Sequence, residues 1–141
     1  MRKANLLIIS FSVLFATLIV TVSVAYCESP CDRVDRGLSN ERKIALAPAI
    51  AQQLQVSSVN VLQSFKMGKW SIIYVETDEA DEAFLFYSGD PIASHYITLW
   101  SGGASRTEEQ KIKDWVIKSV PGIPKRLAGC FAWHVTKNRD R

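Results

Sequence analysis

The sequence predicts an α+β fold: an antiparallel meander of about four to five strands packed against an N-terminal helix and a C-terminal helix in a single domain. Two observations support this prediction. Segments rich in β-branched and aromatic residues follow one another between Gly68 and Arg106, with connections too short for parallel crossovers. Segments with apolar residues at helical spacing flank them on both sides.

Residues 1–25 have the layout of a secretory signal peptide. Arg2 and Lys3 are basic, residues 6–25 are uncharged, and residues 23–25 suit a cleavage site. The apolar run is also long enough to cross a hydrocarbon core of about 30 Å, so an uncleaved signal anchor is the alternative. We therefore expect a periplasmic protein, or one anchored to the inner membrane and facing the periplasm.

The rest of the chain is divided into an irregular lead-in over residues 26–38, an α+β domain over residues 39–136 and a charged tail over residues 137–141. Loss of Arg2 and Lys3 with the leader would reduce the 17 basic residues to 15, against 14 acidic residues. The exported part is then close to neutral, so no nucleic-acid partner is expected. Contact with a membrane is expected only through the N-terminal segment, if it stays uncleaved.

The three cysteines indicate a disulfide, because exported chains meet an oxidising compartment. We predict a pair between Cys31 and Cys130, which would close a long loop and stabilise the fold by about 4 to 5 kcal/mol in the chain-entropy model. The alternative is a local pair between Cys27 and Cys31, with Cys130 as a buried small apolar residue. The role of Cys27 and the cleavage point stay open.

The first helix is predicted to begin near Glu41, where Ser39 and Asn40 offer N-cap oxygens. Pro48 either kinks this helix or starts a second short one. The apolar face expected against the sheet consists of Ile44, Ala47, Ile50, Ala51 and Leu54.

Four strands are predicted at residues 56–66, 70–77, 82–88 and 95–100. The second and third are apolar at nearly every position, so either both faces of the sheet are covered or one face carries an exposed apolar patch. Strict alternation in the first strand would place Val59, Val61 and Phe65 on one face, and Asn60, Leu62, Ser64 and Lys66 on the other.

The clearest helix is predicted at residues 107–120. Thr107 and Gln110 are spaced as a capping box, and residues 121–124 contain two prolines that end the helix. Residues 127–136 fit either a short helix or a strand, and the alternation of apolar residues favours the strand. The buried stripe expected on the long helix consists of Ile112, Trp115, Val116 and Val120.

The loop at residues 101–106, Ser-Gly-Gly-Ala-Ser-Arg, is the strongest candidate for a contact site. It can present backbone N–H groups, two hydroxyls and a guanidinium to an anion or to a partner's cleft. It lacks the lysine and the spacing of a nucleotide-binding loop, and the simpler alternative is a connector that needs positive φ at glycine. The predicted partner-binding residues here are Trp100, Ser101, Gly102, Gly103, Ser105 and Arg106.

In its content of serine and glycine, this loop resembles the inhibitory loop of periplasmic lysozyme inhibitors. The resemblance covers residues 101–106 only. The rest of that family's pattern is absent, so no residue role is transferred to this chain.

Five carboxylates crowd the turn after the second strand: Glu76, Asp78, Glu79, Asp81 and Glu82. Their spacing is not that of an EF-hand, so a solvated acidic turn is expected rather than a calcium site. Such a turn would attract a basic partner surface, and we predict Glu79 and Asp81 as contact residues. The alternative is a pair of acids acting in glycoside hydrolysis, which depends on a separation that sequence does not define.

His95 and His134 are the only imidazoles, and neither has the spacing of a zinc site. Both are expected to be structural or surface residues. No catalytic residue, metal or cofactor is predicted.

By elimination, these features favour an exported protein-binding module, specifically an immunity or inhibitor protein that occludes a cell-wall-degrading enzyme. One alternative is a carboxylate-dependent cell-wall or glycan hydrolase that uses residues 76–82. Another is a small-ligand-binding envelope protein with a pocket between helix and sheet.

Overall fold

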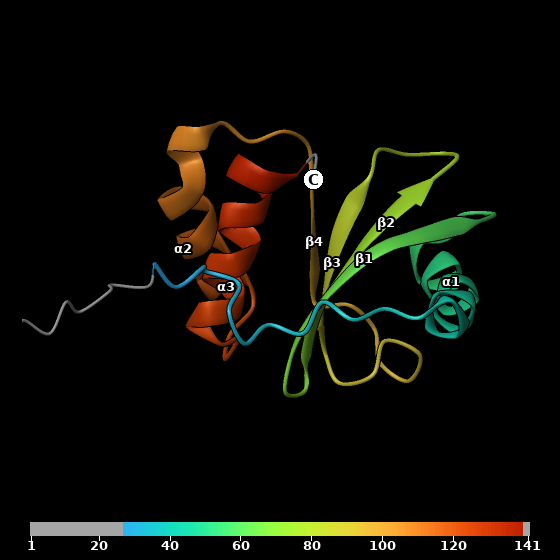
Figure 1. Cartoon of the computed structure of the whole chain (residues 1–141). Helices are drawn as coiled ribbons and strands as arrows, with labels where there is room; N and C mark the ends of the chain where they lie inside the picture. The colour runs from blue at the N-terminus through green and yellow to red at the C-terminus, as the bar shows by residue number, and fades with distance from the viewer. Residues whose placement is uncertain (1–26, 140–141) are drawn as a thin grey trace, which may run out of the picture.

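Four antiparallel strands form a meander in the order β1-β2-β3-β4 in the described part of the chain, which is residues 27–139 of a computed structural model (Figure 1). The predicted signal peptide or anchor lies outside the described residues. The strands are β1 (Val59–Met67), β2 (Trp70–Thr77), β3 (Ala83–Ser88) and β4 (Thr98–Ser101). The helices are α1 (Asn40–Leu54), α2 (Glu109–Ser119) and α3 (Lys125–Trp133), with a 3₁₀ turn at Arg106–Glu108 and a π-helix at His134–Asn138.

The sheet is the middle layer of three, with α1 on one face and α2 with α3 on the other (Figure 1). Each face carries its own apolar core, and β3 supplies both of them because its successive side chains point to opposite faces. Phe84 and Phe86 pack toward α3, whereas Leu85 and Tyr87 pack toward α1, and all four are fully buried. The predicted α+β meander is confirmed, with both faces of the sheet covered.

A β-bulge at Leu62 divides β1 into two registers. Val61 pairs with Val75, but the next pair joins Gln63 to Tyr74, so one residue is inserted without a partner. The prediction that Val59, Val61 and Phe65 share a face is therefore wrong. Val59 and Val61 pack in the α1 core, Phe65 packs in the α3 core, and Ser64 and Lys66 are placed on the α1 side.

Helix α1 is continuous through Pro48, so Pro48 does not start a second helix. Ser39 caps it by accepting a hydrogen bond from the backbone N–H of Arg42 at 3.2 Å. The buried face centres on Leu46 and Ile50. Ile44 was expected on this face, but it lies about 140° around the helix from the midpoint between Leu46 and Ile50, and the residue is 74% exposed.

Helix α2 follows a 3₁₀ turn, and the capping box belongs to that turn, two residues earlier than predicted. The box joins Ser105 to Glu108 instead of Thr107 to Gln110, with the Ser105 N–H donating to the Glu108 carboxylate at 2.9 Å. The predicted stripe of the helix is retained, because Ile112, Val116 and Val120 are buried and Trp115 is half-buried.

Residues 127–136 are helical, so the preference for a strand was wrong. Helix α3 lies between α2 and the sheet and is buried at most of its positions. Such a helix lacks the polar face that reveals helical period, so the alternation of Phe131, Trp133 and Val135 was misleading. In the predicted tail, residues 137 and 138 are the last two residues of the π-helix, and residue 139 follows it directly.

Strand β4 is shorter than predicted, because residues 95–97 belong to the preceding loop. Asp90 organises that loop, since its carbonyl oxygen accepts hydrogen bonds from the N–H groups of Ala93 at 2.9 Å and Ser94 at 2.8 Å. Its carboxylate also accepts from the N–H of Ile92 at 3.0 Å. This turn lies between the two predicted strands, and beyond it the N–H of Ile97 donates to the carbonyl oxygen of Phe86 in β3 at 2.7 Å, just before β4 begins.

The predicted disulfide between Cys31 and Cys130 is present, with a sequence separation of 99 residues. It attaches the lead-in to α3, and the backbone of Asp35 then pairs with Lys66 at the edge of the sheet. The local alternative with Cys27 is wrong: Cys27 is exposed and unbonded within residues 27–139. Over those same residues, we find no helix with the length and apolar character of a membrane span.

Candidate functional site

Two of the predicted contact segments meet at one end of the sheet. Ala83 at the start of β3 pairs with Ser101 at the end of β4, so the acidic β2–β3 turn and the glycine loop lie beside one another (Figure 1). We call residues 101–106 together with residues 78–82 the loop end.

Arg139 connects the two halves of the loop end. Its Nη1 donates to the carbonyl oxygen of Gly102, and its Nη2 lies 3.4 Å from the Tyr74 hydroxyl and 3.5 Å from the Glu82 carboxylate. The Tyr74 hydroxyl in turn donates to Glu82. Arg139 was not among the predicted contact residues, because a charged terminal tail gives no local signal of tertiary contact.

The glycine loop is exposed at Ser101, Gly102 and Gly103. Gly102 has φ of 100°, which a residue with a side chain rarely adopts. A Cβ added at Gly103 would meet no atom within 4 Å, so this position is open to solvent. The loop is therefore both a connector with a positive-φ glycine and an exposed surface.

Ser105 and Arg106 differ in how much they can offer a partner. The Ser105 hydroxyl is engaged inside the protein, at 3.1 Å from Glu108 and 3.0 Å from the Thr107 hydroxyl. Hydrogen bonds from the backbone N–H and the hydroxyl of Ser105 lower the pKa of Glu108. Arg106 is exposed.

Trp100 anchors the loop on its side of the sheet. Its ring centroid lies 5.9 Å from that of Phe84 and 5.6 Å from that of Phe131, and the side chain is half-buried. A shallow groove of about 220 Å³ lies beside it, between Trp100, Gly103 and Trp115. A small apolar side chain of a partner could enter there.

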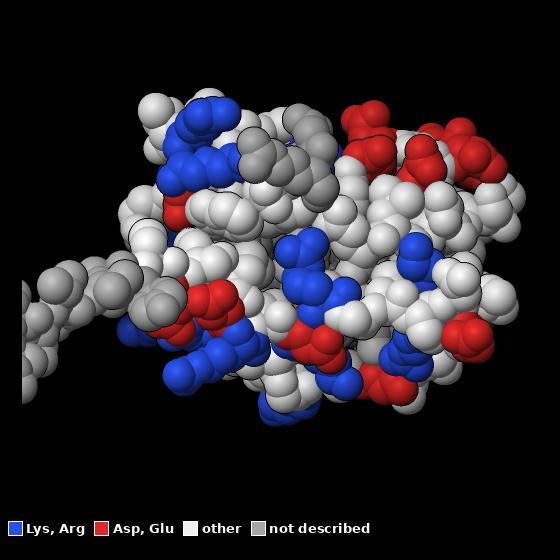
Figure 2. Space-filling view, viewed as in Figure 1, with Lys and Arg blue, Asp and Glu red and all other residues white. Residues whose placement is uncertain are grey.

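The acidic turn forms an exposed anionic surface, which Figure 2 shows gathered at this end of the molecule. Its carboxylates bind separate partners: Glu76 accepts from Asn60, Asp78 from Ser58 and Glu79 from Ser57. The hydroxyl and the backbone N–H of Ser57 lower the pKa of Glu79, whereas a general acid needs a raised pKa. Within the described residues, no three acidic, histidine or cysteine side chains converge as metal ligands.

The two histidines occupy different environments. His95 is exposed in the β3–β4 loop, with Nδ1 at 3.0 Å from the carbonyl oxygen of Tyr96. His134 is fully buried, with its ring centroid 4.9 Å from that of Phe65. Burial, followed by the charges of Arg36 and Arg139, lowers the pKa of His134 to about 4.

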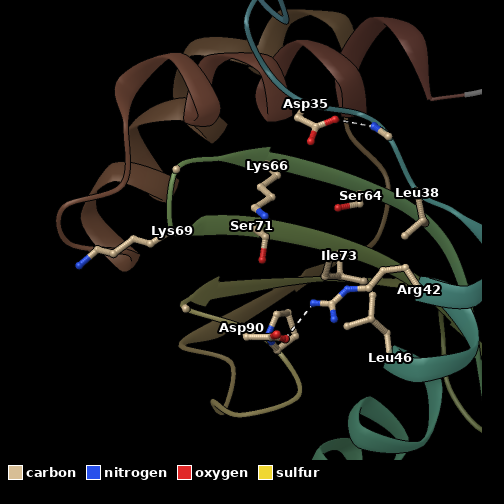
Figure 3. Close-up of a pocket in the computed structure, with 14 residues that line it drawn as sticks. Asp35, Leu38, Arg42, Leu46, Ser64, Lys66, Lys69, Ser71, Ile73 and Asp90 are labelled. Atoms are coloured by element: carbon tan, nitrogen blue, oxygen red, sulfur yellow. Dashed lines mark hydrogen bonds and ion pairs between the residues drawn. The ribbon is translucent and has the colours of Figure 1, made fainter.

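A larger cavity, of about 360 Å³, lies at the opposite end of the sheet under α1 (Figure 3). Its rim is formed by the β1–β2 hairpin around Gly68 and by the turn at Gly89. A pocket between helix and sheet was one of the alternatives drawn from the sequence, and this cavity lies between α1 and the sheet, but its lining residues were not predicted.

Comparison with family models, with curated proteins and with solved structures gives no match for this chain. The geometry of the loop end and of the cavity is therefore the basis for the functional proposals below.

Proposed function

We propose that this chain is an exported protein-binding module of the periplasm, an immunity or inhibitor protein that occludes the active site of a cell-wall-degrading enzyme with its loop end. The proposal rests on one observation: an exposed small-residue loop and an acidic turn lie side by side at one end of the sheet. Arg139 contacts both of them.

The loop is exposed but held in place, which favours tight association. The Ser105–Glu108 capping box, the packing of Trp100 and the Arg139 bond to Gly102 hold residues 101–106 from three sides. A loop that is already ordered loses less conformational entropy when it binds. Its glycines also allow the backbone to approach a partner closely.

The acidic turn carries negative charge that would complement a basic surface of the partner enzyme. Asp78, Glu79 and Asp81 are exposed next to the loop, and such a surface accelerates encounter with a basic enzyme surface around its cleft. The groove between Trp100 and Trp115 offers a place for one partner side chain.

The disulfide between Cys31 and Cys130 fits a location outside the reducing cytosol. We further propose that residues 1–25 act as a signal peptide and that the protein is located in the periplasm.

The test is affinity capture from a periplasmic extract, followed by mass spectrometry and by assay of the captured enzyme on peptidoglycan. Gly103→Tyr fills the loop surface without a clash inside the protein, since an added Cβ at this position meets open space. We expect this variant to lose inhibition by about tenfold or more.

Ala45→Tyr, at an exposed position of α1, is the matched control and should inhibit like the native chain. Recovery of no cell-wall enzyme, or equal inhibition by both variants, would reject the proposal. Degradation of peptidoglycan by the purified chain itself, lost in Glu76→Gln, would replace it with hydrolysis.

A further inference from the structure

We propose that the cavity between α1 and the sheet binds a small organic anion, with its carboxylate or phosphate head at Lys66 and Ser71 and a short aliphatic body against α1. The cavity is at the opposite end of the sheet from the loop end, so this inference does not depend on the proposed function.

Ser71 is the buried polar group of the cavity that lacks a protein partner in the described part of the chain. Its side chain faces the cavity and the residue is only 7% exposed. Its Oγ has no hydrogen-bond partner among residues 27–139. A buried hydroxyl without a partner is unfavourable, and an acceptor oxygen in the cavity would remove this cost.

Lys66 provides the positive charge beside that hydroxyl. It is the direct cross-strand partner of Ser71, and Figure 3 shows its ammonium next to the Ser71 side chain. Over the described range, Lys66 forms no ion pair. An ammonium and a hydroxyl at adjacent strand positions can donate together to one carboxylate or phosphate.

The cavity also contains the charges of Arg42, Asp90 and Asp35. Arg42 binds the carboxylate of Asp90 at 2.8 Å, and Asp35, which stays charged, accepts from the N–H of Gly37 at 2.8 Å. The charge beside the unpartnered Ser71 hydroxyl is the ammonium of Lys66, so the head group expected at that point is an anion.

The bulge at Leu62 is what produces this arrangement. By shifting the alternation of β1, it turns Ser64 and Lys66 toward α1 instead of toward the α3 core. The cavity thus has a polar floor on β1 and β2. Its apolar wall consists of Leu38, Leu46, Ile73 and Pro91.

Size and lining together define the ligand class. A volume of about 360 Å³ is at the small end of the range for small-molecule sites. An acidic head at Lys66 and Ser71 leaves space toward Leu46 and Ile73 for a few methylene groups. A short-chain carboxylate or an alkyl phosphate satisfies both requirements.

The experiment is isothermal titration calorimetry of the native chain with four probes of similar length: hexanoate, butyl phosphate, hexan-1-ol and hexylammonium. We expect hexanoate or butyl phosphate to bind about tenfold or more tightly than the alcohol, because a charge-assisted hydrogen bond is lost with the neutral head. The tighter of the two anions identifies the head group. Tighter binding of hexylammonium, or equal binding of the alcohol, would overturn the proposal, and so would the absence of binding by every probe.

Lys66→Met keeps the aliphatic stem and should weaken anion binding about tenfold or more. Lys69→Met is the matched control in the same hairpin. Lys69 also lines the cavity, but its ammonium lies 5.4 Å from the ring centroid of Trp70, and Figure 3 shows it pointing away from Lys66 and Ser71. This variant should retain native affinity, and equal losses in the two variants would contradict the assignment.

Ser71→Ala should weaken binding several-fold while raising thermal stability in the absence of probe, since it removes the unpartnered hydroxyl. If this variant fails to fold, the comparison of Lys66→Met with Lys69→Met still tests anion binding in the cavity, because both lysines are exposed. Gly103→Tyr should leave anion binding unchanged, which keeps a failure here separate from a failure of the proposed inhibitor function.

Discussion

Arg139 donates a hydrogen bond to the carbonyl oxygen of Gly102, across 37 residues of sequence. This contact fixes the glycine loop to the end of the C-terminal π-helix. The same guanidinium lies 5.8 Å from the ring centroids of Tyr74 and Trp100, so it also covers the aromatic core beneath the loop.

Arg139→Met is therefore expected to loosen the loop end. We expect a loss of about 1 to 2 kcal/mol in the free energy of unfolding, together with faster amide hydrogen exchange at residues 101–104. Arg106→Met is the control, since Arg106 is an exposed arginine at the other end of the same loop. Equal exchange rates in the two variants would show that Arg139 does not hold the loop.

His134 is expected to make stability depend on pH. Its pKa is about 4 in the folded state, against about 6.5 in the unfolded chain. Below pH 6.5 the unfolded state binds a proton that the native state does not, so stability falls as pH decreases from about 6.5 to about 4, by about 3 kcal/mol in total. Urea unfolding at several pH values across this window measures the effect.

His134→Phe should remove this part of the pH dependence and keep the edge contact with Phe65. At neutral pH the variant should be at least as stable, because neither imidazole nitrogen has a partner among residues 27–139. His95→Asn changes the exposed imidazole and should leave the native pH profile. A His134→Phe variant with the native profile would refute the assignment.

The disulfide should contribute a large share of the stability. Cys31→Ala with Cys130→Ala opens a loop that spans 99 residues, and we expect the free energy of unfolding to decrease by about 3 to 5 kcal/mol. Denaturant titration of the oxidised native chain and the double variant measures it. Cys27→Ala, at an exposed position, should fall within about 0.5 kcal/mol of native, and a similar change in both variants would be inconsistent with this role.

Gly122 is expected to resist substitution. Its φ is 87°, and an added Cβ would lie 3.3 Å from the Trp70 ring. Gly122→Ala should therefore destabilise the protein by about 1 to 2 kcal/mol. Gly103→Ala has neither constraint and should be close to neutral, so comparable melting temperatures for the two variants would contradict the steric argument.

The sequence by itself determined those features whose signals are local. Strands at 70–77 and near 83–88, the helix near 107–120 and the N-cap at Ser39 follow from β-branched composition, helical spacing and capping chemistry in short windows. The Cys31–Cys130 pair followed from the compartment that the N-terminal segment indicates.

Tertiary structure decided the rest, because contacts between distant segments outweigh weak local preferences. Burial between α2 and the sheet made residues 127–136 helical despite their alternation, and the bulge at Leu62 reversed the faces of β1 beyond it. The positions of Arg139 and Ser71 depend on those arrangements. Their roles at the loop end and in the cavity became visible only when the chain was folded, since neither residue has a neighbour in sequence that indicates its partner in space.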